Sequence, residues 1–186
     1  FAQRTHAQRV IAQLTAAGYG YLSAPSLDRT QARRWDLSSV DPASNPDVAY
    51  MLAVHAALIA KGEIARDTPV FTMGMSNGGG FANLFAAAAK AQGLPVKAVA
   101  DYMGPFPAAM REALRPGGPA ALSPTLLILS RNDGLVNAEQ TGAIARRLQG
   151  EGARIEAHLN EEKRICPATF NLVTGLTAQD RSRLVT

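Results

Sequence analysis

The stretch that decides the fold is Val70-Phe71-Thr72-Met73-Gly74-Met75-Ser76-Asn77-Gly78-Gly79-Gly80-Phe81. Residues 69–73 are mostly apolar, and this short run predicts a buried strand. The glycine-rich segment 74–80 predicts a sharp turn, and the alanine-rich segment 81–90 predicts a helix. A strand, a tight turn and a helix in direct succession are typical of α/β proteins.

The turn contains a motif that carries chemistry. Residues 74–78, Gly-Met-Ser-Asn-Gly, fit the pattern G-x-S-x-G, in which a sharp turn presents a serine hydroxyl at the edge of a sheet. We expect Ser76 to be a nucleophile and the backbone N–H of Asn77 to be an oxyanion-hole donor. Gly74 and Gly78 are expected where a side chain would strike neighbouring backbone. An ordinary glycine-rich turn between a strand and a helix is the alternative.

Other glycine-rich sites do not fit these residues. A dinucleotide-binding G-x-G-x-x-G would need glycine where Ser76 stands, and a phosphate-binding P-loop would need lysine and then serine or threonine after its last glycine. The small residues Gly79, Gly80 and Ala82 instead predict a helix that approaches the sheet closely.

The rest of the chain alternates strands and helices, which predicts an α/β fold with a mainly parallel sheet in a single domain spanning residues 1–186. Glycine or proline punctuates most of these elements. Besides residues 69–73, strands are expected at 19–24, 96–102, 125–130 and 154–160, and helices at 5–17, 47–61, 81–90, 138–149, 167–174 and 178–186.

A carboxylate and a histidine follow the serine in the chain. Asp133 comes just after the apolar strand 125–130, where open α/β sheets place their sites, and it could orient an imidazole. An aspartate in an ordinary turn is the alternative reading, and Asp101, at the end of the preceding strand, is the reserve candidate. His158 follows Asp133 by 25 residues, whereas His6 and His55 lie in predicted helices.

These motifs, in the order Ser76, Asp133, His158, resemble the α/β-hydrolase-fold serine hydrolases, in the broad esterase, lipase and polyester-depolymerase-like group. The resemblance rests on residues 74–78 in their strand–turn–helix context and on Asp133 with Val136, which is similar to the D-x-x-V of that family. It implies a three-layer α/β-hydrolase fold and a Ser76–Asp133–His158 triad that cleaves a small-molecule ester, without a metal or organic cofactor.

Two parts of the sequence depart from the family pattern. The family places its histidine in a loop after the last strand, whereas His158 lies within the strand pattern 154–160, so the base could instead lie in an absent segment or be lost. The family also has a strand and a second oxyanion donor before the first helix. We therefore expect the N-terminal strands to be absent from this chain, and the C-terminal end could also be incomplete. A different small fold that pairs these strands in another way is the alternative.

Composition limits the other function classes. The 186 residues carry a net charge of +4, but the basic residues are scattered, so nucleic-acid binding is not expected. Cys166 is the one cysteine and the histidines are few, which argues against a metal centre. No apolar run reaches the length of a membrane-spanning helix. The compartment and the oligomeric state are open, and any leader would lie upstream of Phe1.

Three further alternatives remain open from the sequence. A peptidase of the same fold is one, although it would usually carry an extra domain. A non-catalytic binding protein that lost its histidine is another. The segment 104–123 could form a small cap over the site or a surface loop, and Trp35 could line an acyl pocket or cover the edge of the sheet.

Overall fold

The computed structural model describes residues 2–30, 34–107, 109–110, 122–133 and 135–160. The described residues fall into two compact units, residues 2–24 and residues 25–160. In the first unit, α1 (Ala2–Ala16) confirms the helix predicted at 5–17. Val10, Ile11 and Leu14, which share one face at helical spacing, are half-buried, and Gly18 follows the helix with a φ of 85°. The predicted helices at 167–174 and 178–186, and Cys166, lie outside the described residues.

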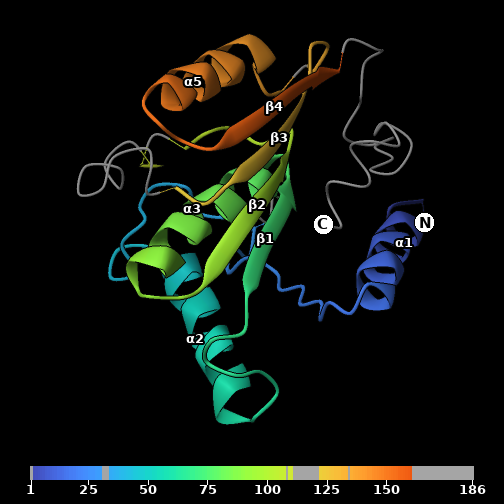
Figure 1. Cartoon of the computed structure of the whole chain (residues 1–186), viewed down its shortest axis with the longest axis vertical. Helices are drawn as coiled ribbons and strands as arrows, with labels where there is room; N and C mark the ends of the chain where they lie inside the picture. The colour runs from blue at the N-terminus through green and yellow to red at the C-terminus, as the bar shows by residue number, and fades with distance from the viewer. Residues whose placement is uncertain (1, 31–33, 108, 111–121, 134, 161–186) are drawn as a thin grey trace. The chain divides into compact units, whose positions relative to one another are not determined.

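The second unit contains a parallel sheet. Its strands are β1 (Val70–Met75), β2 (Val96–Tyr102), β3 (Thr125–Ser130) and β4 (Ile155–Asn160), in the order β1-β2-β3-β4 (Figure 1). The parallel sheet and the bounds of β2 and β3 confirm the sequence prediction. Strand β1 runs two residues further than predicted, because Gly74 and Met75 pair with Asp101 and Tyr102.

The prediction of a strand at residues 19–24 was wrong, since these residues form no regular element. An apolar alternating pattern becomes a strand only where a neighbouring strand takes up its backbone N–H and C=O groups. The paired strands of the described sheet are β1 with β2, β2 with β3 and β3 with β4, and none of these pairs includes residues 19–24.

Helix α2 (Pro46–Ala60) confirms the predicted helix at 47–61, with Pro46 in its first turn. The Asn45 side chain caps it by accepting hydrogen bonds from the N–H groups of Asp47 and Val48, both at 3.1 Å. Helix α5 (Ala138–Gly150) ends one residue later than the predicted range 138–149, because Gly150 is still helical. Gly152, with a φ of 100°, follows the helix.

Helix α3 (Asn77–Ala91) begins four residues before the predicted start at residue 81. Isolated glycines disfavour helix by about 1 kcal/mol each, so residues 78–80 predicted a turn. In the structure these glycines form the first turn of α3. At Gly79 and Gly80 the helix approaches Asp101 and Pro105 too closely for a side chain. Packing therefore overrides local propensity at this point.

Helices α2, α3 and α5 pack on one face of the sheet. The register aligns Val99 with Thr125 and Ile155, so alternate residues of β2, β3 and β4 share a face. Val99 joins the core of α2 and α3, while Ile155 joins the core of α5, so these helices cover the same face. Leu84 of α3 and Leu127 of β3 are fully buried there.

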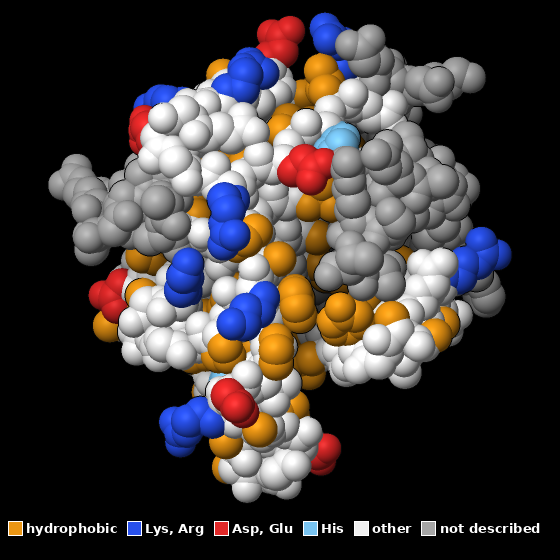
Figure 2. Space-filling model, viewed as in Figure 1, with side chains coloured by type: hydrophobic (Ala, Val, Ile, Leu, Met, Phe, Trp, Pro, Cys, Tyr) orange, Lys and Arg blue, Asp and Glu red, His pale blue; other side chains and the backbone are white. Residues whose placement is uncertain are grey.

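Two surface features bear on the function classes. None of the helices in the described ranges has the length and apolarity needed to cross a membrane. On the face drawn in Figure 2, the Lys and Arg side chains stand apart from one another among uncharged and acidic ones. Most of the segment 104–123, the predicted cap or surface loop, lies outside the described residues.

Candidate active site

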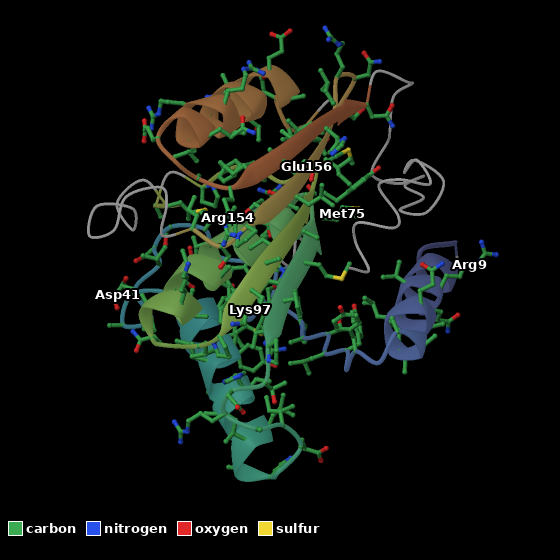
Figure 3. The ribbon with its side chains drawn as sticks, viewed as in Figure 1. Arg9, Asp41, Met75, Lys97, Arg154 and Glu156 are labelled. Atoms are coloured by element: carbon green, nitrogen blue, oxygen red, sulfur yellow. The ribbon has the colours of Figure 1, made fainter. Side chains whose placement is uncertain are left out.

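The carboxyl ends of the four strands meet at one edge of the sheet, because the strands are parallel. The residues Met75, Tyr102, Ile128 and His158 are aligned across the sheet, one from each strand. Met75 on β1 and Glu156 on β4, both labelled in Figure 3, belong to the two outer strands of the described sheet. Open parallel sheets bind their ligands beyond this edge.

Ser76 occupies the single-residue turn between β1 and α3. Its backbone has a φ of 53° and a ψ of −127°, a region that residues other than glycine rarely adopt and that costs about 1–3 kcal/mol. The surrounding hydrogen bonds hold this conformation. Its N–H donates to the Tyr102 carbonyl at 2.9 Å, and its carbonyl accepts from the N–H groups of Gly79 and Gly80 at 2.9 and 3.1 Å.

The two motif glycines have different surroundings. A methyl group on Gly74 would overlap the carbonyl of Gly78 and lie 2.7 Å from the Gly79 nitrogen, so this position requires glycine for the expected reason. On Gly78, the same group would meet only the Trp35 indole, at 3.8 and 3.9 Å, which is ordinary contact. The expectation that backbone contact excludes a side chain at Gly78 was therefore wrong.

Asp101 packs beneath the start of α3. A methyl group on Gly79 would overlap the Asp101 carboxylate and lie 3.1 Å from the Gly104 Cα. One on Gly80 would lie 2.9 Å from the Pro105 carbonyl oxygen. The small residues thus let α3 approach β2 closely, as the sequence predicted, and the glycines at 79 and 104 leave room for the Asp101 side chain.

The Asp101 carboxylate is 1% exposed and uses both oxygens within the fold. Oδ1 accepts from the Gly104 N–H at 2.8 Å and Oδ2 accepts from Asn83 Nδ2 at 2.6 Å. Burial raises the pKa of Asp101 to about 7, although these two hydrogen bonds act in the opposite direction. Both oxygens are engaged on the face that α3 covers, so this reserve candidate acid is held within the core.

Asn77 is the first residue of α3. The N–H groups in the first turn of a helix have no partner within the helix, so those of Asn77 and Gly78 are directed toward the space before it. The Asn77 side chain bonds to the backbone of Trp35, accepting from its N–H at 2.7 Å and donating to its carbonyl at 3.1 Å. Sequence reasoning did not find this contact, which joins residues 42 positions apart.

Asp133 lies in the turn after β3, at the same edge of the sheet as Ser76. Its Oδ1 accepts from the N–H groups of Leu135 and Val136 at 2.8 and 3.1 Å, so its own turn fixes the carboxylate. Asp133 also lines an open pocket of about 360 Å³ with residues 131 and 135–139. Because β3 is two strands from β1, the backbones at the two strand ends are about 10 Å apart.

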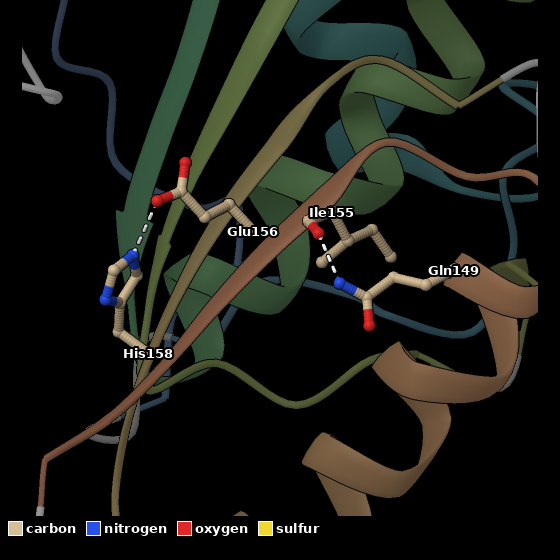
Figure 4. A network of polar contacts seen from close by, with 4 residues as sticks. All are labelled: Gln149, Ile155, Glu156 and His158. Carbon is tan, nitrogen blue, oxygen red and sulfur yellow. Dashed lines mark hydrogen bonds and ion pairs between the residues drawn. The ribbon is translucent and has the colours of Figure 1, made fainter.

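His158 lies inside β4, as the sequence pattern predicted, and is paired in register with Ile128. Its Nε2 lies 2.9 Å from Glu156 Oε1 on the same face of the strand (Figure 4). Three strand spacings separate His158 from Met75, a distance of about 14 Å across the sheet. The structure brings Ser76 and Asp133 to one edge and places His158 on β4, the described strand furthest from β1.

The described residues contain no group of three or more His, Cys, Asp or Glu side chains placed to hold a metal ion. His55 is half-buried in α2, and the side chain of His6 lies outside the described residues.

Comparison with known proteins identifies the fold. No protein-family model matches the chain, and a search of curated proteins finds no significant similarity. Among solved structures, a fungal esterase from Rhizomucor miehei is matched over 97% of this chain and 65% of its own, at 16% identity with a TM-score of 0.56. A hyperthermophilic esterase from the archaeon Pyrobaculum calidifontis is matched over 75% and 57%, at 17% identity and 0.50.

The acylaminoacyl peptidase of Pyrococcus horikoshii is matched over 63% of this chain and 23% of its own, at 15% identity with a TM-score of 0.48. This chain thus spans less than two thirds of each of these three proteins. The parallel sheet with its helices is part of an α/β-hydrolase fold. At the level of the fold, the protein is similar to these esterases.

Proposed function

We propose that the protein is a serine hydrolase that cleaves small carboxylic esters through an acyl-enzyme on Ser76. The observation that carries this proposal is the conformation of Ser76, with its φ of 53° between β1 and α3. Strained backbone of this kind is retained where it serves a site, and here it presents a hydroxyl at the edge where α/β sheets bind ligands.

The reaction takes place in two halves. Ser76 Oγ forms a bond to the ester carbonyl carbon while a base takes the hydroxyl proton, and the proton then goes to the alcohol as the ester C–O bond breaks. Water repeats the sequence on the acyl-enzyme and releases the carboxylic acid. The N–H of Asn77 donates to the oxyanion in both halves, a contribution of about 3 kcal/mol.

The proposal assigns the base to His158 and its orienting carboxylate to Asp133, from their order in the chain. In the described structure the imidazole bonds to Glu156, and two strands, β2 and β3, lie between its strand and β1. This position favours a second candidate function, a binding protein that holds its ligand in the same crevice without hydrolysing it.

A fluorophosphonate probe separates the two functions, because it labels only an activated serine. We expect the protein to be labelled at Ser76 and to hydrolyse short p-nitrophenyl esters. Ser76→Ala should lose both properties, whereas Ser44→Ala, at an exposed serine in the loop before α2, should keep both. A folded protein that is neither labelled nor active would refute the hydrolase and favour binding.

The base is tested with the same probe. His158→Gln should slow labelling and turnover by at least about a thousandfold if the imidazole takes the serine proton. Labelling at the parent rate would remove His158 from the mechanism and leave Ser76 as the nucleophile.

A further inference from the structure

The Asn77 side chain joins the residue after Ser76 to a loop far away in the sequence. Its single amide group pairs with both backbone groups of Trp35, accepting from the N–H at 2.7 Å and donating to the carbonyl at 3.1 Å. Two bonds to one residue fix the plane of the amide as well as its position. We call this pair of hydrogen bonds the Asn77–Trp35 bridge.

The Trp35 ring packs against the same end of α3. It stacks on Phe81 with ring centroids 4.2 Å apart and planes 12° from parallel. Its Nε1 would lie 3.8 Å from a methyl group on Gly78. Trp35 therefore contacts α3 at residues 77, 78 and 81, which lie in the first two turns of the helix. Both the ring and the backbone of Trp35 take part in this contact.

The loop that carries Trp35 is itself fixed by buried side chains at the start of α2. Asp47 is 2% exposed, and its Oδ2 accepts from the Asp36 N–H at 2.8 Å. Asn45 is fully buried, and its Nδ2 donates to the carbonyls of Asp36 and Ser39 at 3.0 and 2.7 Å. Asp36 follows Trp35 directly, so the partner of Asn77 has a position set by α2.

We infer that Asn77 has a second role, as a positioning residue whose side chain, through Trp35, sets the direction of its own backbone N–H. This inference rests on the proposed function, because that N–H is the oxyanion donor there. The N–H lies in the first turn of α3, where the helix supplies no partner to align it. Oxyanion donors act over 2.7–3.1 Å, so a shift of a few tenths of an ångström weakens them.

The test replaces Asn77 by alanine, which keeps the N–H and removes the bridge. We expect kcat for p-nitrophenyl acetate to fall about ten- to a hundredfold while KM changes less than about twofold. Affinity for a trifluoromethyl ketone, which forms a tetrahedral adduct with the serine, should fall by a similar factor. Affinity for the product carboxylate should not change.

A matched control separates positioning from loss of stability. Gln149→Ala also removes an amide that donates to a backbone carbonyl, that of Ile155 at 2.5 Å, but in α5 and β4 (Figure 4). It should leave kcat within about twofold of the parent. Asn77→Ser is measured alongside, in case Asn77→Ala does not fold. The serine hydroxyl can bond to a local backbone group in the first helical turn.

The outcomes are distinct. If the parent protein is neither labelled by fluorophosphonate nor active, the proposed function is wrong and the positioning role is overturned with it. If the parent is active and a folded Asn77→Ala or Asn77→Ser variant keeps its kcat, the positioning role alone is overturned. Equal losses of kcat in the Asn77 and Gln149 variants would also overturn it.

Discussion

The two glycines of the motif provide the sharpest test of the structure, because sequence treats them alike and the structure separates them. The perturbation is the same at both positions, a single methyl group. Neither Gly74 nor Gly78 has a positive φ, so alanine brings no backbone strain of its own at either position. Any difference between Gly74→Ala and Gly78→Ala then reports the space around each Cα.

The magnitudes follow from the neighbouring atoms. On Gly74 the methyl group would overlap the Gly78 carbonyl, and the Gly79 nitrogen at 2.7 Å would have to move by about 0.7 Å to reach ordinary contact. These atoms are backbone and cannot rotate away, so we expect Gly74→Ala to lower the free energy of unfolding by about 3 kcal/mol. On Gly78 the methyl group fits, and alanine should stabilise the first turn of α3 by about 0.5–1 kcal/mol.

The assay is urea unfolding of the parent and both variants, followed by circular dichroism and by the Trp35 fluorescence. The single tryptophan lies against Gly78 and Phe81, so its signal reports the start of α3 directly. We expect the midpoint of Gly74→Ala to fall and that of Gly78→Ala to stay or rise. Equal shifts of the two midpoints would refute the separate roles of the two glycines.

The remaining predictions concern buried polar groups. Because folding raises the pKa of Asp101 to about 7, the folded state binds its proton more tightly than the unfolded chain does, and stability falls as pH rises from 5 to 8 by about 3 kcal/mol. Asp101→Asn should remove this slope in urea unfolding, and a parent without the slope would contradict the burial. Asn45→Ala should cost about 3 kcal/mol, because the fully buried Asn45 side chain caps α2 and donates to the carbonyls of Asp36 and Ser39, which would lose this partner. Asn137→Ala, which removes an exposed cap of α5, should cost about 1 kcal/mol, and equal costs would argue against the buried role of Asn45.

Elements with clear signals in the local sequence were predictable. Apolar runs between glycine and proline located β2 and β3 to the residue, and Pro46 with the helical spacing after it located α2. The start of α3 was not predictable, because glycine propensity favours a turn at residues 78–80, and the close packing of Gly79 and Gly80 against Asp101 and Pro105 depends on residues further along the chain. The failed strand at 19–24 has the same cause, since strands depend on partners elsewhere in the chain.

The candidate site was predictable in part. The positions of Ser76 and Asp133 at one edge follow from parallel strands and chain order alone. The depth of Asp101 could not be predicted, because its burial depends on glycines at 79 and 104 that only folding brings together. The Asn77–Trp35 bridge could not be predicted either. The two residues are 42 positions apart, and neither residue type indicates the other as its partner.

The strain at Ser76 explains why these contacts gather around one residue. A φ of 53° costs about 1–3 kcal/mol and persists only where the surroundings over-determine it. Three independent features hold this conformation. They are the close approach of Gly74 to the Gly78 carbonyl, the hydrogen bond from the Ser76 N–H to the Tyr102 carbonyl, and the packing of Asp101 against the first turn of α3. Release of any one of them lets the turn relax toward ordinary helix or strand geometry. Gly74→Ala and Asp101→Asn should therefore alter fluorophosphonate labelling of Ser76 even where the protein stays folded, whereas Gly78→Ala should not.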